Sequence, residues 1–190
     1  MYQSLITKPF KKAKYLSISQ PFHEAHKAID WVGSYGTPIC SPEKVKIEWI
    51  IGDGYTPESY EPMRRGYGVW MTGLETGQVY VYWHLLPYLP VWAGDIIERG
   101  QIIGYMGNSG LVRSGGIDVP VGESRTLAPH LGTHLHQVVF KQGHSVGIWK
   151  GDEIDPLPIT DMDMEPAYTL SDQLSAMVKT TSKMVKLLTR

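Results

Sequence analysis

Short apolar runs separated by glycine-containing turns dominate the chain from Ser17 to about Val121. The runs are YLSIS, VKIEWII, YGVWMTGL, QVYVYWHL and DIIERGQIIGYM, all rich in β-branched or aromatic residues. The breaks between them contain GDG, ETG and NSG, whose residues tolerate the positive φ angles of tight turns. The pattern predicts a mainly β fold, built as an antiparallel meander with hairpin turns.

The composition agrees with this fold class and excludes some functions. The 20 glycines and 13 prolines suit many turns, and 190 residues suit one domain with an appendage. A net charge of −1 gives no electrostatic reason to expect a nucleic acid or an anionic membrane as partner. The only cysteine, Cys40, has no partner for an intrachain disulfide, so we expect it to be a small buried apolar residue.

Composition shifts divide the chain into four expected parts. Residues 1–16 read as a solvated basic arm, 17–150 as the main domain, 151–166 as a solvated acidic connector, and 167–190 as a helix. Within the main domain, Leu111 to Gly132 has little periodicity and reads as a long loop. No apolar run is long enough for a signal peptide or a membrane span, so we expect a protein made in the cytoplasm with no membrane insertion.

The expected C-terminal helix has an apolar stripe. Its members alternate four and three residues apart: Leu170, Leu174, Met177, Thr181, Met184 and Leu188. Ser171 is a suitable N-cap. Because an apolar stripe is costly to leave in water, we expect this helix to dock on itself or on another protein of an assembly.

Two histidines one residue apart, His134 and His136, lie in the apolar run LGTHLHQVVF. If this run is a strand, both side chains lie on one face, because residues i and i+2 point the same way. That arrangement suits a metal site, and it also suits two unremarkable polar residues on a half-exposed strand. Only further ligands elsewhere in the chain could decide between the two.

The segment HEAHKAIDW offers such ligands. His26 and Asp30 lie four residues apart, a spacing at which two side chains can converge on one ion. A hydrolytic zinc site takes three protein ligands and leaves one position for water, so a further ligand from His23 would close that position. The pair alone is weak support for a metal site, since so short a motif occurs often by accident.

Four blocks in order resemble the lysostaphin-type (LytM-like) zinc endopeptidases, which cut peptidoglycan cross-links. The blocks are SISQPFHEAHKAIDWVGSYGTPICSP, YGVWMTGLETGQVYVYWHL, VWAGDIIERGQIIGYMGNSG and THLH. The resemblance covers about Ser17 to Gln142 and implies an antiparallel β-sheet groove with the metal at its floor. The chain departs from the family pattern at Ala28, Trp83 and Gln137, and its segment from Leu111 to Gly132 is longer than usual.

Carried over residue by residue, the resemblance puts Zn²⁺ on His26, Asp30 and His136 and puts the catalytic roles on His134 and His84. It implies a zinc metalloendopeptidase acting on peptidoglycan peptides, with a phage lysin or a virion-associated wall hydrolase as the expected setting. The bond that is cut, a glycine bridge or a D-alanyl to diaminopimelate cross-link, stays open. The choice between His84 and His134 as the main general base also stays open. His130 is expected to be an exposed loop residue.

Two other classes of protein remain as alternatives. One is a catalytically silent binding or scaffold module of the same fold within a larger assembly. The other is a carrier domain, because AGDIIERGQIIGYMG resembles the hairpins of biotinyl and lipoyl domains. The tip of that hairpin lacks a lysine to modify, which puts the carrier last. Metal content separates the peptidase from both, since only a peptidase requires about one zinc per chain.

Overall fold

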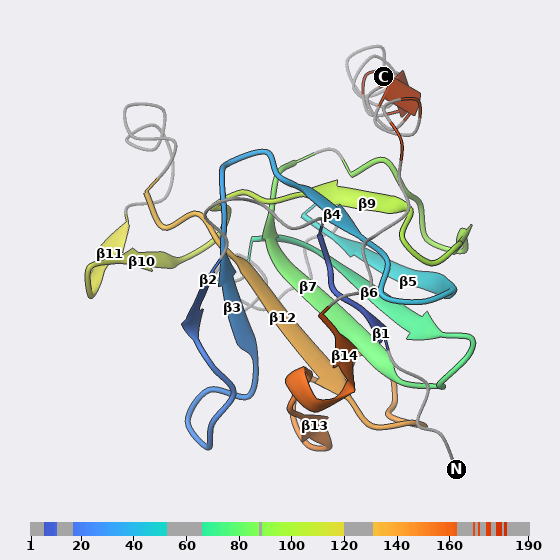
Figure 1. The fold of residues 1–190 in the computed structure, drawn as a ribbon, viewed down its shortest axis with the longest axis horizontal. Coiled ribbons are helices and arrows are strands. Elements are labelled where there is room, and N and C mark those ends of the chain that lie inside the picture. The colour runs from blue at the N-terminus through green and yellow to red at the C-terminus, as the bar shows by residue number, and fades with distance from the viewer. Residues whose placement is uncertain are drawn as a thin grey trace.

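The computed structural model describes residues 6–10, 17–52, 66–87, 89–119 and 131–162, together with residues 169, 171, 174, 175, 178, 179 and 181. An antiparallel sheet of eight strands forms its centre (Figure 1). In order across the sheet, the strands are β2 (Ser17–Gln20), β3 (Ile29–Val32), β12 (Leu135–Phe140), β7 (Val79–Leu85), β6 (Tyr67–Gly73), β5 (Val45–Ile51) and β8 (Ile96–Ile97). The eighth, β13 (Glu153–Ile154), pairs with the end of β12.

Three two-stranded pairings surround this sheet. β4 (Pro38–Cys40) pairs with β9 (Ile102–Tyr105), and β10 (Val112–Ser114) pairs with β11 (Ile117–Val119) in a projecting hairpin (Figure 1). The third pairing joins the two ends of the domain in parallel. It consists of β1 (Ile6–Thr7) and β14 (Thr160–Asp161), and β14 follows a short 3₁₀ helix, η2 (Leu157–Ile159).

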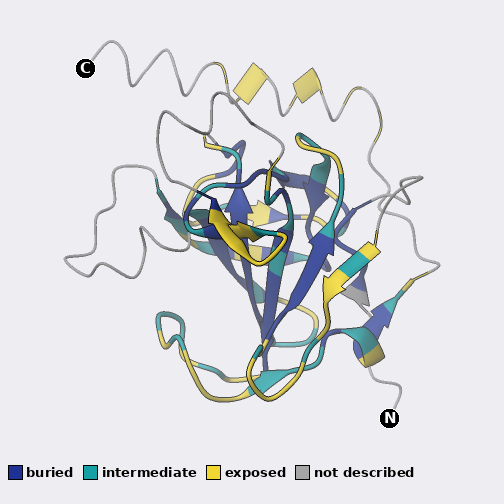
Figure 2. Ribbon diagram, turned by 90° about the vertical axis from the view of Figure 1, so that its left-hand side faces the viewer, coloured by how far each residue is buried: buried dark blue, intermediate teal, exposed yellow. Residues whose placement is uncertain are grey.

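Apolar residues cover both faces of the central sheet, so the central strands are buried on either side (Figure 2). Strand β7 shows the alternation: Tyr80 and Tyr82 belong to the larger core, and Val81 and Trp83 belong to the smaller core on the opposite face. The segment that follows β12 covers part of the smaller core, with Trp149 packed against it. We call the face with the smaller core the outer face.

The expected fold class, a mainly antiparallel β fold, is confirmed. The run VKIEWII is strand β5, and YGVWMTGL and QVYVYWHL contain β6 and β7. One detail of the loop prediction is wrong: Leu111 to Gly132 is not all irregular, because residues 112–119 form the β10–β11 hairpin around Gly115 and Gly116. Residues 120–130 of that segment lie outside the described residues. Cys40 is fully buried, as expected.

The expected solvated arm and solvated connector need correction where the structure describes them. Phe10 is fully buried and stacks edge-on with Trp31, and Lys8 is only 3 % exposed. In the acidic stretch, Ile159 and Thr160 are buried, and β13 and β14 both pair with other strands. Apolar residues between the charges therefore anchor both segments to the domain.

The C-terminal segment is described only in part. Its described residues from Ser171 to Thr181 are helical and exposed, and Leu174 is 55 % exposed. Leu170, Met177, Met184 and Leu188 lie outside the described residues, so the helix as a whole and its docking stay predictions. Among the described residues, no helix has the length and apolar character needed to cross a membrane.

Candidate metal and catalytic site

Strand pairing brings together two of the expected ligands, His136 and Asp30. His136 on β12 stands directly opposite Asp30 on β3 and opposite Trp83 on β7. Because Trp83 and Val138 both belong to the outer face, the pleat places His136 on that face as well. Nδ1 of His136 lies 2.8 Å from Oδ1 of Asp30.

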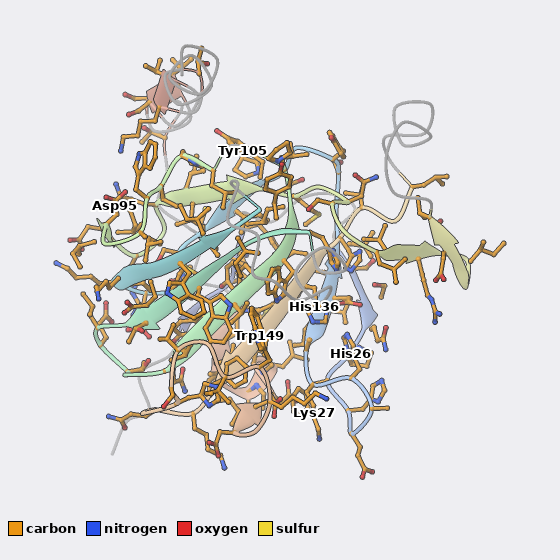
Figure 3. All side chains as sticks on the ribbon, turned by 180° about the vertical axis from the view of Figure 1, so that it is seen from behind. His26, Lys27, Asp95, Tyr105, His136 and Trp149 are labelled. Atoms are coloured by element: carbon orange, nitrogen blue, oxygen red, sulfur yellow. The ribbon has the colours of Figure 1, made fainter. Side chains whose placement is uncertain are left out.

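His26 reaches the same carboxylate from the loop between β2 and β3. A short bridge between His23 and His26 closes this loop, with two backbone hydrogen bonds of 2.9 and 3.0 Å. The His26 ring places Nδ1 3.3 Å from the Pro21 carbonyl oxygen and Nε2 3.4 Å from Oδ1 of Asp30. Figure 3 shows His26 and His136 close together.

The three side chains fit a zinc ion. Their ligand atoms all lie within 4.8 Å of one another. Nε2 of His26 is buried and has no hydrogen-bond partner among the described residues, although it faces a carboxylate. When Nδ1 donates to the Pro21 carbonyl, neutral His26 presents a lone pair at Nε2 beside a carboxylate oxygen, and either a metal cation or a proton between the two atoms would stabilise the pair. Two imidazoles and one carboxylate are a common ligand set of hydrolytic zinc.

Electrostatics keep the carboxylate ionised. Burial acts to raise the pKa of Asp30, but the hydrogen bond of His136 and the close approach of the His26 imidazole outweigh it and hold that pKa well below its usual range. For His136 burial is the larger effect and lowers the pKa, against the opposing hydrogen bond of Asp30. A neutral imidazole and an ionised carboxylate are the forms that bind a metal.

A break in β7 aims His84 at the same site. Tyr80 and Tyr82 face the larger core, so a regular strand would also turn His84 there. Instead the register slips between β6 and β7, His84 has φ +62°, and Leu85 occupies the larger core. The bulge moves the imidazole to the outer face, beside His134, whose ring centroid is 4.4 Å away.

His134 and His84 bind backbone carbonyls in the same way. Nδ1 of His134 lies 2.8 Å from the Gly132 oxygen, and Nδ1 of His84 lies 2.7 Å from the Ser109 oxygen. A carbonyl only accepts, so each Nδ1 carries the proton and each neutral ring keeps a bare Nε2. Nε2 of His134 is 3.9 Å from Oδ2 of Asp30. Burial lowers the pKa of His84 well below its usual range.

The structure therefore brings together all five residues singled out from the sequence. His84, His134 and His136 form a second close group of nitrogen ligands that shares His136 with the first. His23 belongs to neither group; it is exposed, and its ring contacts Gln20 and the Ala25 backbone. His130 lies outside the described residues.

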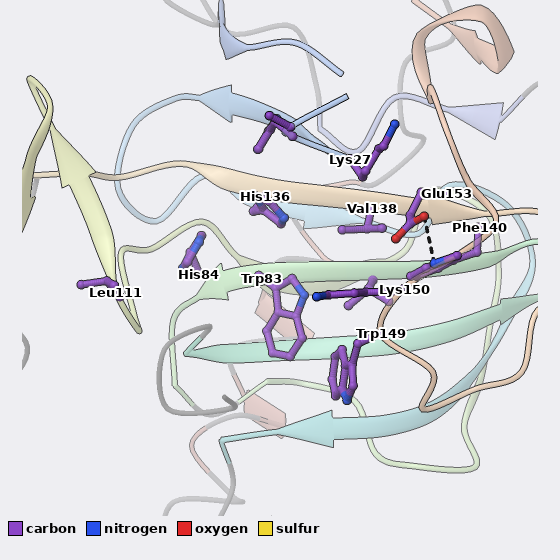
Figure 4. Close-up of a pocket in the computed structure, with 14 residues that line it drawn as sticks. Lys27, Trp83, His84, Leu111, His136, Val138, Phe140, Trp149, Lys150 and Glu153 are labelled. Carbon is purple, nitrogen blue, oxygen red and sulfur yellow. Dashed lines mark hydrogen bonds between the residues drawn. The ribbon is translucent and has the colours of Figure 1, made fainter. Parts of the chain in front are cut away.

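A groove passes through the site and has two arms of different character. The hairpin arm, about 750 Å³, runs between β2 and the β10–β11 hairpin and includes Ser19, Arg113 and Gly116. The aromatic arm, about 590 Å³, runs along the outer face (Figure 4). Its lining beyond the site consists chiefly of Val81, Trp83, Val138, Phe140, Trp149 and Lys150. His26, His84, Leu111 and His136 line both arms, so the groove is continuous through the site.

Sequence reasoning missed several residues that shape this site. Ser109 fixes His84 through its carbonyl, and its hydroxyl donates to the Leu85 oxygen at 2.7 Å and accepts from the Tyr67 amide at 2.9 Å. The turn motif NSG was the only signal for Ser109 in the sequence.

Trp149 and Lys150 in the aromatic arm were also missed. A tryptophan between two glycine turns was the only signal for them in the sequence. Trp92 is 48 % exposed and does not line either arm.

Comparison with known proteins identifies the family. Residues 24–148 match the family described as peptidase family M23. No curated protein sequence is significantly similar to the chain.

Solved structures share the fold. One is a zinc-containing peptidase from Vibrio cholerae, 17 % identical with a TM-score of 0.52, which covers 80 % of this chain and 39 % of its own. Lysostaphin from Staphylococcus simulans is 21 % identical with a TM-score of 0.50, covering 83 % of this chain and 53 % of its own. Csd3 from Helicobacter pylori is 20 % identical with a TM-score of 0.51, covering 97 % of this chain and 43 % of its own.

At these sequence identities, the structural similarity shows that the chain shares the fold of these proteins. The chain spans between 39 % and 53 % of the length of these three proteins. The resemblance to lysostaphin-type peptidases is confirmed, and the family match extends over more than half of the chain and includes all five residues of the site. The chain belongs to peptidase family M23.

Proposed function

We propose that this chain is a zinc-dependent endopeptidase that hydrolyses peptide cross-links of bacterial peptidoglycan. One observation supports the proposal above the others: His26, Asp30 and His136 converge within 4.8 Å while His134 and His84 stand beside them. A silent binding module of the same fold would have no need of this complete set. Membership of a peptidase family supports the reaction class.

In this proposal His26, Asp30 and His136 hold the metal. A bound zinc would polarise the scissile carbonyl and lower the pKa of its water from about 15.7 to about 7. The remaining steps belong to the two other histidines, whose bare Nε2 atoms can each accept one proton.

His134 is the better placed of the two to take the proton of the attacking water. Its Nε2 lies 3.9 Å from the Asp30 carboxylate, so a positive charge gained there is stabilised. Once protonated, His134 can pass the proton to the departing amine. His84 donates to the oxyanion of the tetrahedral species only in its doubly protonated form, because its Nδ1 proton is held by Ser109. One proton cannot serve both steps, and burial lowers the pKa of His84, so we assign the proton transfers to His134.

Release of muropeptides tests this function. Purified full-length protein loaded with zinc should solubilise peptidoglycan and generate new amino termini, and a chelator should stop it. The His136→Ala variant should release nothing above background. Normal release by that variant would refute the proposal and favour the silent module.

The setting expected from the sequence, a phage lysin or a virion-associated enzyme, stays a prediction. Mass spectrometry of purified virions tests it directly. Detection of the chain at a fixed copy number per particle would support a virion component, and efficient export by an ordinary secretion route would count against both settings.

A further inference from the structure

Gln137 is a fully buried polar residue directly behind the metal site. It follows the ligand His136 on β12, and the pleat of the strand turns it to the larger core, on the face opposite the groove. Its neighbours on that face of β12, Leu135 and Val139, are aliphatic and belong to the larger core. Burying an amide among apolar side chains is unfavourable unless its polar atoms are hydrogen-bonded.

Both polar atoms of the amide have partners, one on each neighbouring strand. Oε1 accepts a hydrogen bond from Nε1 of Trp31 on β3 at 2.7 Å, and Nε2 donates to the hydroxyl of Tyr82 on β7 at 3.3 Å. An indole N–H can only donate, which fixes the end of the amide that faces β3. Burial raises the pKa of the Tyr82 phenol well above its usual range, so the hydroxyl stays neutral. We call Trp31, Gln137 and Tyr82 the polar bridge.

The polar bridge joins the three strands that carry the site. These strands hold the metal ligand Asp30, the metal ligand His136 and the catalytic candidate His84 (Figure 1). Trp31 and Gln137 are each the next residue after a ligand. A shift of β12 against β3 would therefore change both the polar bridge and the pairing of the ligands.

The register of β12 is not set by a tight turn. A short hairpin turn fixes the register of the two strands that it joins, as it does between β6 and β7. Neither neighbour of β12 in the sheet is next to it in the chain, because Gln137 lies 106 positions from Trp31 and 55 positions from Tyr82. Contacts between side chains must therefore select this register.

The apolar pattern of β12 excludes only some of the wrong registers. A slip by one residue turns the whole strand over, which the core does not allow. A slip by two residues keeps every side chain on its own face and moves His136 along Asp30 by roughly 7 Å, too far for the two to share one ion. Such a slip would leave the Trp31 indole and the Gln137 amide without their partners inside the core, which is costly.

We propose that Gln137 is a positioning residue, which acts through Trp31 and Tyr82 to hold β12 in the register that sets His136 opposite Asp30. Gln137 faces away from the groove, so it acts on the ligands and not on the substrate. A single buried polar residue specifies the register of coiled coils by the same principle. The inference goes beyond the proposed function and rests on the metal ligands named there.

Gln137→Met tests the inference, because methionine has a similar length and cannot hydrogen-bond to both partners as an amide does. Cross-strand nuclear Overhauser contacts between the backbones of Asp30 and His136 report the register in the full, metal-free chain. Zinc affinity is measured by competition with a chelator, at a temperature where circular dichroism shows each variant to be folded. Val139→Ala is the matched control, because it disturbs the same core from the same strand and leaves the polar bridge in place.

We expect part of the Gln137→Met molecules to lose the contacts between Asp30 and His136. The variant should bind zinc about 10- to 100-fold more weakly, the usual range for residues that support metal ligands. Tyr82→Phe removes one hydroxyl and keeps the ring, so it should show a smaller loss of affinity. Adding Tyr82→Phe to Gln137→Met should cost little more, because both act through one bridge. Val139→Ala should be less stable and, once folded, should bind zinc with unchanged affinity.

Unchanged register contacts or unchanged zinc affinity in Gln137→Met would overturn the inference. An equal loss of affinity in Val139→Ala would do the same, because it would show that any disturbance of this core weakens the site. If Gln137→Met does not fold, Tyr82→Phe decides, and unchanged zinc affinity in that variant would refute the role of the polar bridge.

The register contacts separate this inference from the proposed function. If the contacts and the zinc affinity depend on Gln137 but the unaltered zinc-loaded chain releases no muropeptides, the positioning role stands and the peptidase proposal fails. If the unaltered chain is active and Gln137→Met keeps both its register and its affinity, the peptidase proposal stands and the positioning role fails.

Discussion

Asp30 and His136 face each other across paired strands, with Oδ1 of the aspartate 2.8 Å from Nδ1 of the histidine. The two residues are 106 positions apart in the chain, and their distance is set by the register between β3 and β12. A one-residue slip of either strand would turn one of the two side chains to the opposite face. The ligand pair therefore depends on correct sheet pairing.

Removal of any one ligand should cost most of the metal affinity. We expect His26→Ala, Asp30→Ala and His136→Ala to hold much less than one zinc per chain after dialysis, because two ligands rarely retain the ion. Elemental analysis of the purified variants measures this. His23→Ala is the matched control, since His23 is close in sequence and outside both close ligand groups; full zinc in the Asp30 variant would contradict the assignment.

The two catalytic candidates should behave differently from the ligands. We expect His134→Ala and His84→Ala to keep about one zinc and lose about 10²- to 10⁴-fold in turnover, the usual range for a general acid or base. Nδ1 of each ring is hydrogen-bonded to a backbone carbonyl, so Nε2 is the atom that accepts the proton. A glutamine amide cannot accept that proton, so His134→Gln should not restore activity. Loss of zinc in the His134 variant would exchange the roles of His134 and His136.

The sequence predicts much of this arrangement because its signals are local. The strand runs follow from alternation and turn residues, and the five site residues follow from the H-x-x-x-D and H-x-H spacings together with the family blocks. The bulge that turns His84 to the outer face has no such signal, since it depends on how β6 and β7 settle into register. The parallel pairing of β1 with β14 likewise joins segments about 150 residues apart. Neither segment has a sequence pattern that predicts the other as its partner.

A buried carboxylate away from the site should contribute to stability. Glu43 is fully buried and accepts hydrogen bonds from the Glu75 amide at 2.7 Å, the Thr76 amide at 3.1 Å and the Tyr80 hydroxyl. In Glu43→Gln, one oxygen becomes an NH₂ group facing donors, which should cost about 1–3 kcal/mol of unfolding free energy.

Denaturant unfolding of the unaltered chain and of Glu43→Gln measures that loss of unfolding free energy. Zinc content and turnover per folded molecule should stay unchanged, because Glu43 hydrogen-bonds to the turn between β6 and β7 and lines neither arm. Equal midpoints for the two proteins would show that the turn does not depend on the carboxylate.

Gly68 leaves space for the indole of Trp83, which lines the aromatic arm. A Cβ at this position would lie 2.4 Å from Cε3 of Trp83, closer than real contacts allow. Gly68→Ala should push the indole out of its packing with Trp149 and cost about 1–3 kcal/mol. Near-ultraviolet circular dichroism and unfolding curves would show both effects. Gly94→Ala is not a suitable control because of its φ of +91°, whereas Ser145→Ala changes an exposed position on the covering loop and should leave both signals as they are.

The C-terminal segment gives the last prediction. Leu174 and Val178 are one helical turn apart, and they are 55 % and 64 % exposed. The apolar stripe of the sequence, which includes Leu174, predicts docking on a second copy or on another protein of an assembly. If the helix docks on a second copy, the full chain should associate at high concentration, and Leu174→Ser with Val178→Ser should weaken that association. Sedimentation velocity over a range of concentrations measures this, with Lys179→Ser as the control for a general surface change. A full chain that stays monomeric, and that binds no assembly protein more tightly than the double variant does, would exclude docking through this face.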